Sequence, residues 1–209
     1  VKRAIDMLVS LLALVVLSPI LLVLMLLIRL DSPGRPIFAQ ERIGRDGKPF
    51  TIYKLRTMTH TAPDNVATGA LKDADMHITR LGAFLRTASL DELPQFVNIL
   101  RGDMSLVGPR PLVPGETDVH AERMRLGAYR VCPGVTGWAQ VNGRDTVNAG
   151  KKAEMDAYYA ENVCFALDMK IIGRTGVYVL TARGIQEGAQ EAAEDSEQGE
   201  QMKAEADDH

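Results

Sequence analysis

Two adjacent carboxylates, Asp91 and Glu92, begin a segment whose apolar residues repeat at helical spacing. With Ser89, Glu92 forms a capping box, which satisfies free backbone N–H groups at a helix start. Pro94 favours Asp91 as the cap instead, because Pro94 then falls at the third helical position, where a missing N–H removes no bond. The same free donors can receive a phosphate. The residues alone favour capping and leave phosphate chemistry as the second reading.

Cations suited to a phosphate occur on both sides of this pair. Lys54 and Arg56 continue the two-residue period of Phe50 and Ile52, so on a strand the two cations project from the same face as these apolar residues. The simpler alternative is an edge strand whose charges prevent pairing with other chains. Further along are Arg86, which lies off a helical apolar stripe, and Arg110, whose two proline neighbours restrict its backbone. Arginine offers a planar fork that matches two phosphate oxygens.

A glycine-rich run, Pro133 to Arg144, adds the polar side chains of Gln140, Asn142 and Arg144. It could contact a nucleotide or form a structural turn, and we expect it to do both. The four histidines are scattered and suggest no metal-ligand set, and the two cysteines form no closely spaced pair, so no zinc module is expected.

The N-terminal run from Met7 to Ile28 contains only two polar side chains, Ser10 and Ser18. As a helix at ~1.5 Å per residue it would measure about 33 Å, enough to cross a hydrocarbon core of roughly 30 Å. We therefore expect membrane association. A cleaved signal peptide fits poorly, because the run exceeds the usual ~7–15 apolar residues and no small-x-small site follows it.

Whether the run crosses the membrane is left open by the residues. Cations flank both of its ends, which indicates that both ends face the cytoplasm. Pro19 should kink the helix at its middle, and the Ser18 hydroxyl can satisfy a carbonyl that the kink frees. A re-entrant segment explains both observations, and a single spanning helix with a tolerated proline is equally compatible.

The remaining elements predict an α+β fold that is mostly helical. Strands over 37–43 and 50–55 should form a hairpin, and apolar periodicity predicts helices near 78–86, 91–100, 151–162 and 168–183, the last on the membrane surface. The expected organisation is a membrane helix over 1–30, a cytoplasmic catalytic domain over 31–185 and a disordered tail over 186–209. That tail holds nine acids and one base, so a chain of net charge −3 leaves a body of +5, which favours anionic partners.

Five ordered motifs closely resemble the bacterial sugar transferases known as monotopic phosphoglycosyl transferases. They are Lys54 to Met58, Asp91 to Gln95, Arg101 to Ser105, Gly108 to Pro111 and Pro133 to Arg144, and the Ser18-Pro19 kink agrees as well. The resemblance covers about residues 1–183 and is to the minimal, short-chain form of the family.

The resemblance implies transfer of a phosphosugar from a UDP-sugar to undecaprenyl phosphate at the cytoplasmic face of the bacterial inner membrane, which starts surface glycan assembly. Asp91 would be the nucleophile, forming an aspartyl phosphosugar and releasing UMP, and Glu92 would be a base or a metal ligand. Short relatives suggest an N-acetylated amino sugar. A homodimer is compatible with the family, and no nucleic acid partner is expected.

This chemistry needs positive charge, because a carboxylate that approaches a diphosphate is repelled by it. We expect Lys54, Arg56, Arg86, Arg110 and a Mg²⁺ ion on Asp91 and Glu92 to supply that charge, with Gln140, Asn142 and Arg144 as further substrate contacts. One departure is Cys132, where the family often has arginine, so a phosphate or nucleotide contact would be missing or replaced there.

Two other functions remain compatible with the residues. A membrane glycosyltransferase of the ordinary kind would release UDP instead of UMP. A non-catalytic membrane adaptor would use its basic body to bind anionic lipid, with Asp91 and Glu92 serving only to cap a helix.

Overall fold

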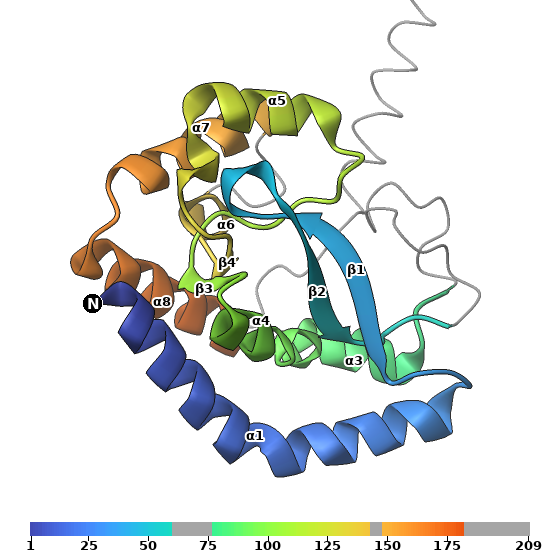
Figure 1. Cartoon of the computed structure of the whole chain (residues 1–209). Helices are drawn as coiled ribbons and strands as arrows, with labels where there is room; N and C mark the ends of the chain where they lie inside the picture. The colour runs from blue at the N-terminus through green and yellow to red at the C-terminus, as the bar shows by residue number, and fades with distance from the viewer. Residues whose placement is uncertain (60–76, 143–147, 182–209) are drawn as a thin grey trace, which may run out of the picture.

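A computed structural model describes residues 1–59, 77–142 and 148–181 (Figure 1). The fold is mostly helical with two small two-stranded sheets, which confirms the predicted α+β class. The predicted acidic tail lies outside the described residues, as does Arg144.

The N-terminal helix α1 (Lys2–Asp31) runs through Pro19 and changes direction near its middle (Figure 1). Pro19 has no N–H to donate to the carbonyl of Val15, four residues earlier. The Ser18 hydroxyl donates to that carbonyl instead, with an Oγ–O distance of 2.9 Å. The predicted kink and its compensation by serine are therefore confirmed.

The N-terminal end of α1 is attached to the rest of the fold by polar side chains. Lys2 Nζ lies 2.8 Å from a carboxylate oxygen of Asp168, and Arg3 donates to two carbonyls at the end of another helix. Asp6, only 4% exposed, accepts a hydrogen bond of 2.7 Å from the Ser105 hydroxyl. These contacts fix the start of α1 to the globular part.

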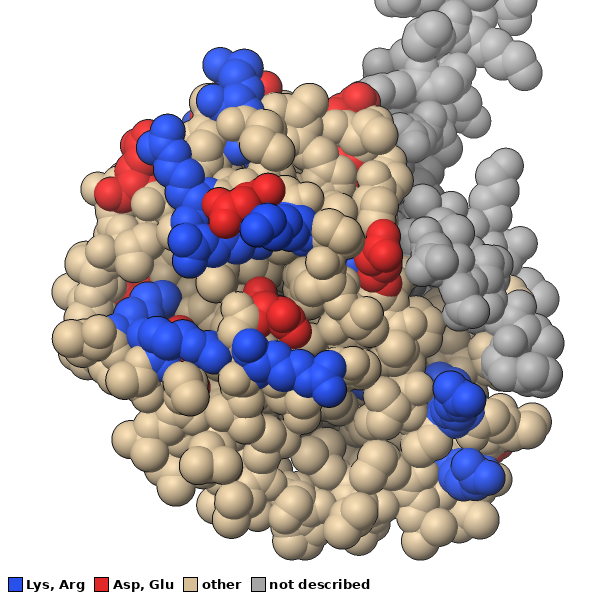
Figure 2. Space-filling view, in the orientation of Figure 1, with Lys and Arg blue, Asp and Glu red and all other residues tan. Residues whose placement is uncertain are grey.

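The C-terminal end of α1 packs into the same globular part through apolar side chains. Leu24 and Ile28 form a core cluster with Leu55 and Leu85. Between the two ends, α1 is long and apolar enough to cross a membrane, and only 11% of its most apolar window is buried. In space-filling view the lower edge of the molecule, where α1 lies, carries almost no charged side chains (Figure 2).

The predicted hairpin is present. Strands β1 (Ile37–Ile43) and β2 (Pro49–Leu55) pair antiparallel, with Ile37 opposite Leu55. The turn between them is the 3-10 segment η1 (Arg45–Gly47), in which Asp46 (φ 58°) and Gly47 (φ 71°) are left-handed. Aspartate and glycine are among the residues that adopt this conformation at low cost.

Most of the helices follow the predicted periodicity. They are α3 (Arg80–Thr87), α4 (Gln95–Arg101), α7 (Ala149–Glu161) and α8 (Phe165–Thr181). Several elements were not predicted from the sequence. They are helices α5 (Thr117–Leu126) and α6 (Trp138–Asn142), the 3-10 segments η3 (Leu90–Glu92) and η4 (Ala128–Arg130), and a parallel pair of strands, β3 (Ser105–Val107) and β4 (Gly134–Thr136).

Three glycines allow close backbone contact where β3 meets β4. A Cβ on Gly134 would lie 2.1 Å from the backbone nitrogen of Gly108, and one on Gly137 would lie 2.2 Å from the carbonyl oxygen of Gly108. Such distances leave no room for a side chain, so glycine is required at both positions. The glycine-rich run therefore has the structural role that we expected as one of its two roles.

Candidate active site

Asp91 and Glu92 lie in η3, the single 3-10 turn between α3 and α4. Ser89, in a left-handed conformation (φ 54°), redirects the chain into this turn; among the described residues its side chain makes no capping hydrogen bond. The prediction that Asp91 caps the helix was wrong, because α4 begins only at Gln95, after Pro94 with its helical φ of −62°. The capping box with Ser89 is likewise not formed.

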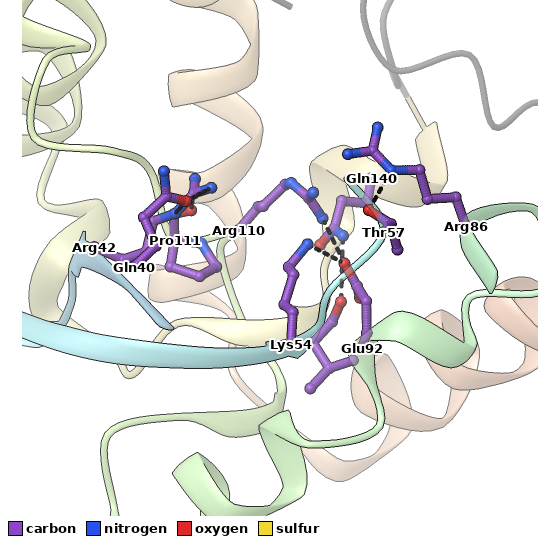
Figure 3. Close-up of polar contacts among 10 residues, drawn as sticks. Gln40, Arg42, Lys54, Thr57, Arg86, Glu92, Arg110, Pro111 and Gln140 are labelled. Atoms are coloured by element: carbon purple, nitrogen blue, oxygen red, sulfur yellow. Dashed lines mark hydrogen bonds and ion pairs between the residues drawn. The ribbon is translucent and has the colours of Figure 1, made fainter. Parts of the chain in front are cut away.

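Glu92 turns instead toward two cations from other elements (Figure 3). Its Oε1 atom lies 2.9 Å from Lys54 Nζ on β2 and 3.5 Å from an Nη atom of Arg110, which follows β3. Asp91, directly before Glu92, is 8% exposed. Three segments that are distant in sequence thus bring one carboxylate, that of Glu92, together with two cations, whereas Asp91 is buried in the turn beside them.

Glu92, Lys54 and Arg110 line a pocket. Its walls are Arg42, Ile52, Lys54, Glu92, Gln95, Arg110, Pro111, Gly134 and Val135. Three of the lining residues are cationic and one is anionic, so the pocket suits an anionic ligand. Glycine and proline residues beside Arg110 bring its backbone close to β4, which forms another wall.

Arg42 is a pocket residue that was not predicted from the sequence. Its guanidinium donates to the Gln40 amide oxygen at 2.6 and 3.0 Å and to the Pro111 carbonyl at 3.1 Å (Figure 3). The alternation of side chains along β1 could have predicted the position of Arg42. Because Gln40 pairs with Ile52 and Arg42 with Phe50, Arg42 shares a face with the Lys54 side of β2.

Arg56 and Arg86 lie away from the Glu92 cluster. The Arg56 guanidinium is buried at the end of α1, where it donates to the carbonyls of Pro33 and Ser32 at 2.8 and 2.6 Å. It also donates to the carbonyl of Ile28 in the last turn of α1, at 3.3 Å, so it joins the end of that helix to the segment after it. Arg86 Nε donates to the Thr57 hydroxyl at 2.9 Å, on the strand's continuation.

The amides of the glycine-rich run point in different directions. Gln140 donates to the carbonyl of Val135, a pocket residue, and in Figure 3 it lies between the Glu92 cluster and Arg86. Asn142 is exposed and is bonded to Trp138 and Arg174 on the side of α8. Cys132, where the family often has arginine, lies beside Gly102, whose carbonyl is 3.8 Å from its Sγ atom.

Comparison with known proteins identifies the family. A family model described as bacterial sugar transferase matches residues 1–182. The chain belongs to the bacterial sugar transferase family. The resemblance suggested by the five motifs is thereby confirmed.

Two relatives illustrate the range of the family. The uncharacterized sugar transferase EpsL of Bacillus subtilis is 41% identical over 89% of this chain and 90% of its own length. The UDP-glucose:undecaprenyl-phosphate glucose-1-phosphate transferase of Escherichia coli is 41% identical over 82% of this chain but only 38% of its own length.

A third relative carries a different sugar in its name. It is the UDP-N-acetylgalactosamine-undecaprenyl-phosphate N-acetylgalactosaminephosphotransferase of Aeromonas hydrophila, 40% identical over 88% of this chain and 44% of its own length. The transferase thus spans less than half of these two relatives with named activities.

The donor atoms at the acidic pair fit a hard cation. Mg²⁺ prefers carboxylate, phosphate and water oxygens and keeps several of its waters. The consecutive carboxylates of Asp91 and Glu92 could supply protein oxygens for it, with phosphate oxygens and water completing the set. Within the described ranges, no group of three or more His, Cys, Asp or Glu residues gathers here or elsewhere, so protein side chains alone would supply at most the two carboxylates of this pair.

The transferase also contains a polar network that joins α1, α7 and α8. The Tyr159 hydroxyl donates to Asp168 at 2.7 Å, and the same carboxylate accepts a hydrogen bond from Lys2. Burial, and next the hydrogen bond to Asp168, raise the pKa of Tyr159 above its usual range. Tyr159 therefore stays protonated at any physiological pH and acts as a structural donor.

Proposed function

We propose that this transferase moves a phosphosugar from a UDP-sugar to undecaprenyl phosphate and thereby starts the assembly of a surface glycan. The observation that carries the proposal is Glu92 held between Lys54 and Arg110, at 2.9 and 3.5 Å, directly after the carboxylate of Asp91. Cations in an anion-binding pocket, next to the turn that carries Asp91, would offset the charge that repels a carboxylate nucleophile from a diphosphate. The substrates named for the relatives supply the two reactants.

In the first half-reaction, an oxygen of the Asp91 carboxylate attacks the phosphorus atom that carries the sugar. A bond forms between that oxygen and phosphorus, and the bond from phosphorus to the oxygen that bridges to the uridine phosphate breaks. The bridging oxygen takes the bonding electrons and leaves as UMP. Lys54 and Arg110 offset the negative charge that would otherwise repel the carboxylate.

In the second half-reaction, a phosphate oxygen of undecaprenyl phosphate attacks the same phosphorus. The bond to Asp91 breaks, its carboxylate is restored, and the lipid diphosphate sugar is released. Because the incoming group is also an anionic phosphate, the same cations serve both halves. The lipid substrate also explains why the pocket belongs to a molecule with a large exposed apolar helix.

Glu92 and Asp91 would together hold Mg²⁺, which when bound would neutralise phosphate charge beyond what the two cations provide. Glu92 is in contact with both Lys54 and Arg110, so its carboxylate also fixes where these two side chains stand. Arg42, at the far wall of the pocket, can meet a second phosphate group of the donor.

The donor is proposed to be a UDP-linked N-acetylated amino sugar. To test this, the full chain in detergent or nanodiscs is incubated with undecaprenyl phosphate, magnesium and one UDP-sugar at a time. We expect an N-acetylated donor to yield UMP as the sole nucleotide product. Release of UDP would indicate an ordinary glycosyltransferase, and no nucleotide from any donor would leave the adaptor function.

We further propose that α1 enters and leaves the membrane on one side, the cytoplasmic face of the inner membrane. Support comes from its two ends, which contact one globular part through Lys2 and Asp6 at the start and Leu24 and Ile28 at the finish. A straight spanning helix could not bring both ends to the same body, whereas a bend at Pro19 can.

Cysteine labelling tests this topology. In a background with Cys132 and Cys164 replaced by alanine, Val1→Cys and Arg35→Cys place single thiols at exposed positions on either side of α1. In sealed inverted vesicles we expect an impermeant maleimide to label both variants, and in intact spheroplasts neither. Val16→Cys, in the middle of the helix, is the matched control that should resist labelling from both sides. Labelling of the two ends from opposite sides would contradict the re-entrant topology.

A further inference from the structure

The segment that carries Arg110, residues 110–113, is held by the carbonyl of every one of its residues. In chain order the donors are an Nη atom of Arg123 (2.8 Å), an Nη atom of Arg42 (3.1 Å), the backbone nitrogen of Ile43 (3.0 Å) and Nε2 of His120 (2.8 Å). Four consecutive bonded carbonyls, in a segment containing Pro111, leave the backbone little freedom. The attachment comes from β1 on one side and α5 on the other.

Helix α5 contributes through one of its faces. Glu116, His120 and Arg123 follow the spacing i, i+4, i+7, so they project toward the same side of the helix. The Glu116 carboxylate accepts a hydrogen bond of 2.9 Å from the backbone N–H of Val113. Together with the bond from Arg123 to Arg110, it attaches both ends of the 110–113 segment to α5. These three side chains bond to backbone atoms of the 110–113 segment. Their bonds therefore do not depend on which side chain stands at position 110.

The bond to the Arg110 carbonyl is made by a residue of a buried ion pair. Arg123 is 3% exposed and Asp156, on α7, is 1% exposed, and their N–O distance is 2.5 Å. Burial raises the pKa of Asp156, and the Arg123 guanidinium opposes that rise. Burying two charges costs several kcal/mol for each, so a pair of apolar side chains would stabilise the fold about as well. Apolar side chains could not, however, donate to the carbonyl of Arg110.

We propose that Arg123, fixed by Asp156, is a positioning residue that orients Arg110 toward the phosphate groups of the substrate. Asp156 accepts from one Nη atom of Arg123, and the other Nη atom donates to the Arg110 carbonyl. With its backbone fixed in this way, the Arg110 guanidinium needs to order only its own side chain to reach the pocket beside Glu92. This inference rests on the proposed function, in which the pocket binds a diphosphate.

The decisive variant removes both charges together. Arg123→Met/Asp156→Leu keeps the interior apolar and leaves no unpaired buried charge, so the thermal unfolding midpoint should stay close to that of the parent chain. The matched control is Glu122→Gln/Arg125→Gln, which removes an exposed ion pair from the same helix. If the apolar pair fails to fold, Arg123→Lys replaces it, because lysine can pair with Asp156 but cannot also reach the Arg110 carbonyl.

The measurement is a double-mutant cycle with Arg110→Ala, read by calorimetric binding of pyrophosphate with magnesium to the full chain. We expect Arg110→Ala to weaken binding by about tenfold and the apolar pair by about fivefold, since a charge-assisted bond to phosphate is worth ~1.5–3 kcal/mol. Combined, the changes should weaken binding no more than Arg110→Ala alone. The Glu122→Gln/Arg125→Gln control is expected to bind as the parent does.

Three results would overturn the inference. These are parent-like binding by the folded apolar pair, separate losses that multiply in the combined variant, and a parent chain that binds pyrophosphate no better than Arg110→Ala. Pyrophosphate binding is measured without turnover, so the result of the double-mutant cycle does not depend on whether the enzyme releases UMP. If the enzyme releases UMP, the same double-mutant cycle measured on kcat/KM should show the same lack of additivity. If Arg123 and Asp156 had only a structural role, replacing them would lower kcat/KM by the same factor in the parent chain and in Arg110→Ala.

Discussion

Asp91→Asn is expected to reduce transferase turnover by about ten-thousand-fold or more, the scale seen when a covalent nucleophile is removed. Asparagine has almost the same shape as aspartate, and Asp91 is one buried residue in a short turn, so the fold should persist. What is lost is the anionic oxygen that forms the bond to phosphorus. UMP release under saturating donor, together with the intact mass of enzyme quenched during turnover, measures the effect.

The same experiment identifies which side chain is the nucleophile. In the parent chain the quenched mass should rise by one phosphosugar, and peptide mapping should locate it on Asp91. Asp118→Asn, an exposed aspartate in the first turn of α5, is the matched control and should leave both rate and adduct unchanged. An Asp91→Asn enzyme that still turns over at the parent rate would rule out the covalent mechanism, and an adduct on another side chain would move the nucleophile there.

Gly134→Ala is expected to destabilise the fold by about 4 kcal/mol or more, which is a large part of a typical domain's stability. The added Cβ would lie 2.1 Å from the nitrogen and 2.7 Å from the Cα of Gly108, and 2.5 Å from the carbonyl oxygen of Thr136. All three are backbone atoms, so no side chain can move aside to make room. Separation of β3 from β4 should follow, and with it the loss of one wall of the pocket.

Thermal unfolding of the purified chain in detergent measures this effect. Gly115→Ala is the matched control, because a Cβ on Gly115 meets nothing within 4 Å. That substitution should change stability by less than about 1 kcal/mol, and a small gain is expected from a less flexible unfolded chain. Equal unfolding midpoints for the two variants would contradict the packing argument.

Patterns that extend over many residues could be predicted from the sequence. The apolar run of α1 with its proline kink, the hairpin around Asp46-Gly47, and helices α7 and α8 each repeat a periodic signal over several turns or strand pairs. Elements of three to five residues could not be predicted in this way. Strands β3 and β4 span three residues each, and their pairing depends on glycines 26 residues apart in the chain.

The helix α5 was missed because it lacks a clear apolar stripe. One of its faces carries Glu116, His120 and Arg123, whose side chains bind backbone atoms of another segment. Polar residues at helical spacing look like a solvated surface when only the sequence is considered. Tertiary structure alone shows that Arg123 is buried and paired.

At the site, residue types were easier to predict than their partners. Lys54, Glu92 and Arg110 do come together, and Arg42 joins them from the paired strand. Arg56 lies two residues after Lys54 and was expected on the same face, but directly after β2 it meets the last turn of α1 instead of the pocket. A period of two residues gives the face of a strand but not what lies opposite each position along it.

The anchoring of α1 at both ends bears on how this protein can be handled. Deleting residues 1–30 would remove Leu24 and Ile28 from a core shared with Leu55 and Leu85, and would strip Asp6 from Ser105. Truncation is thus a poor route to a water-soluble catalytic fragment. Redesign of the outward-facing leucines and valines into charged residues, with the inward contacts left intact, is the route that the architecture permits.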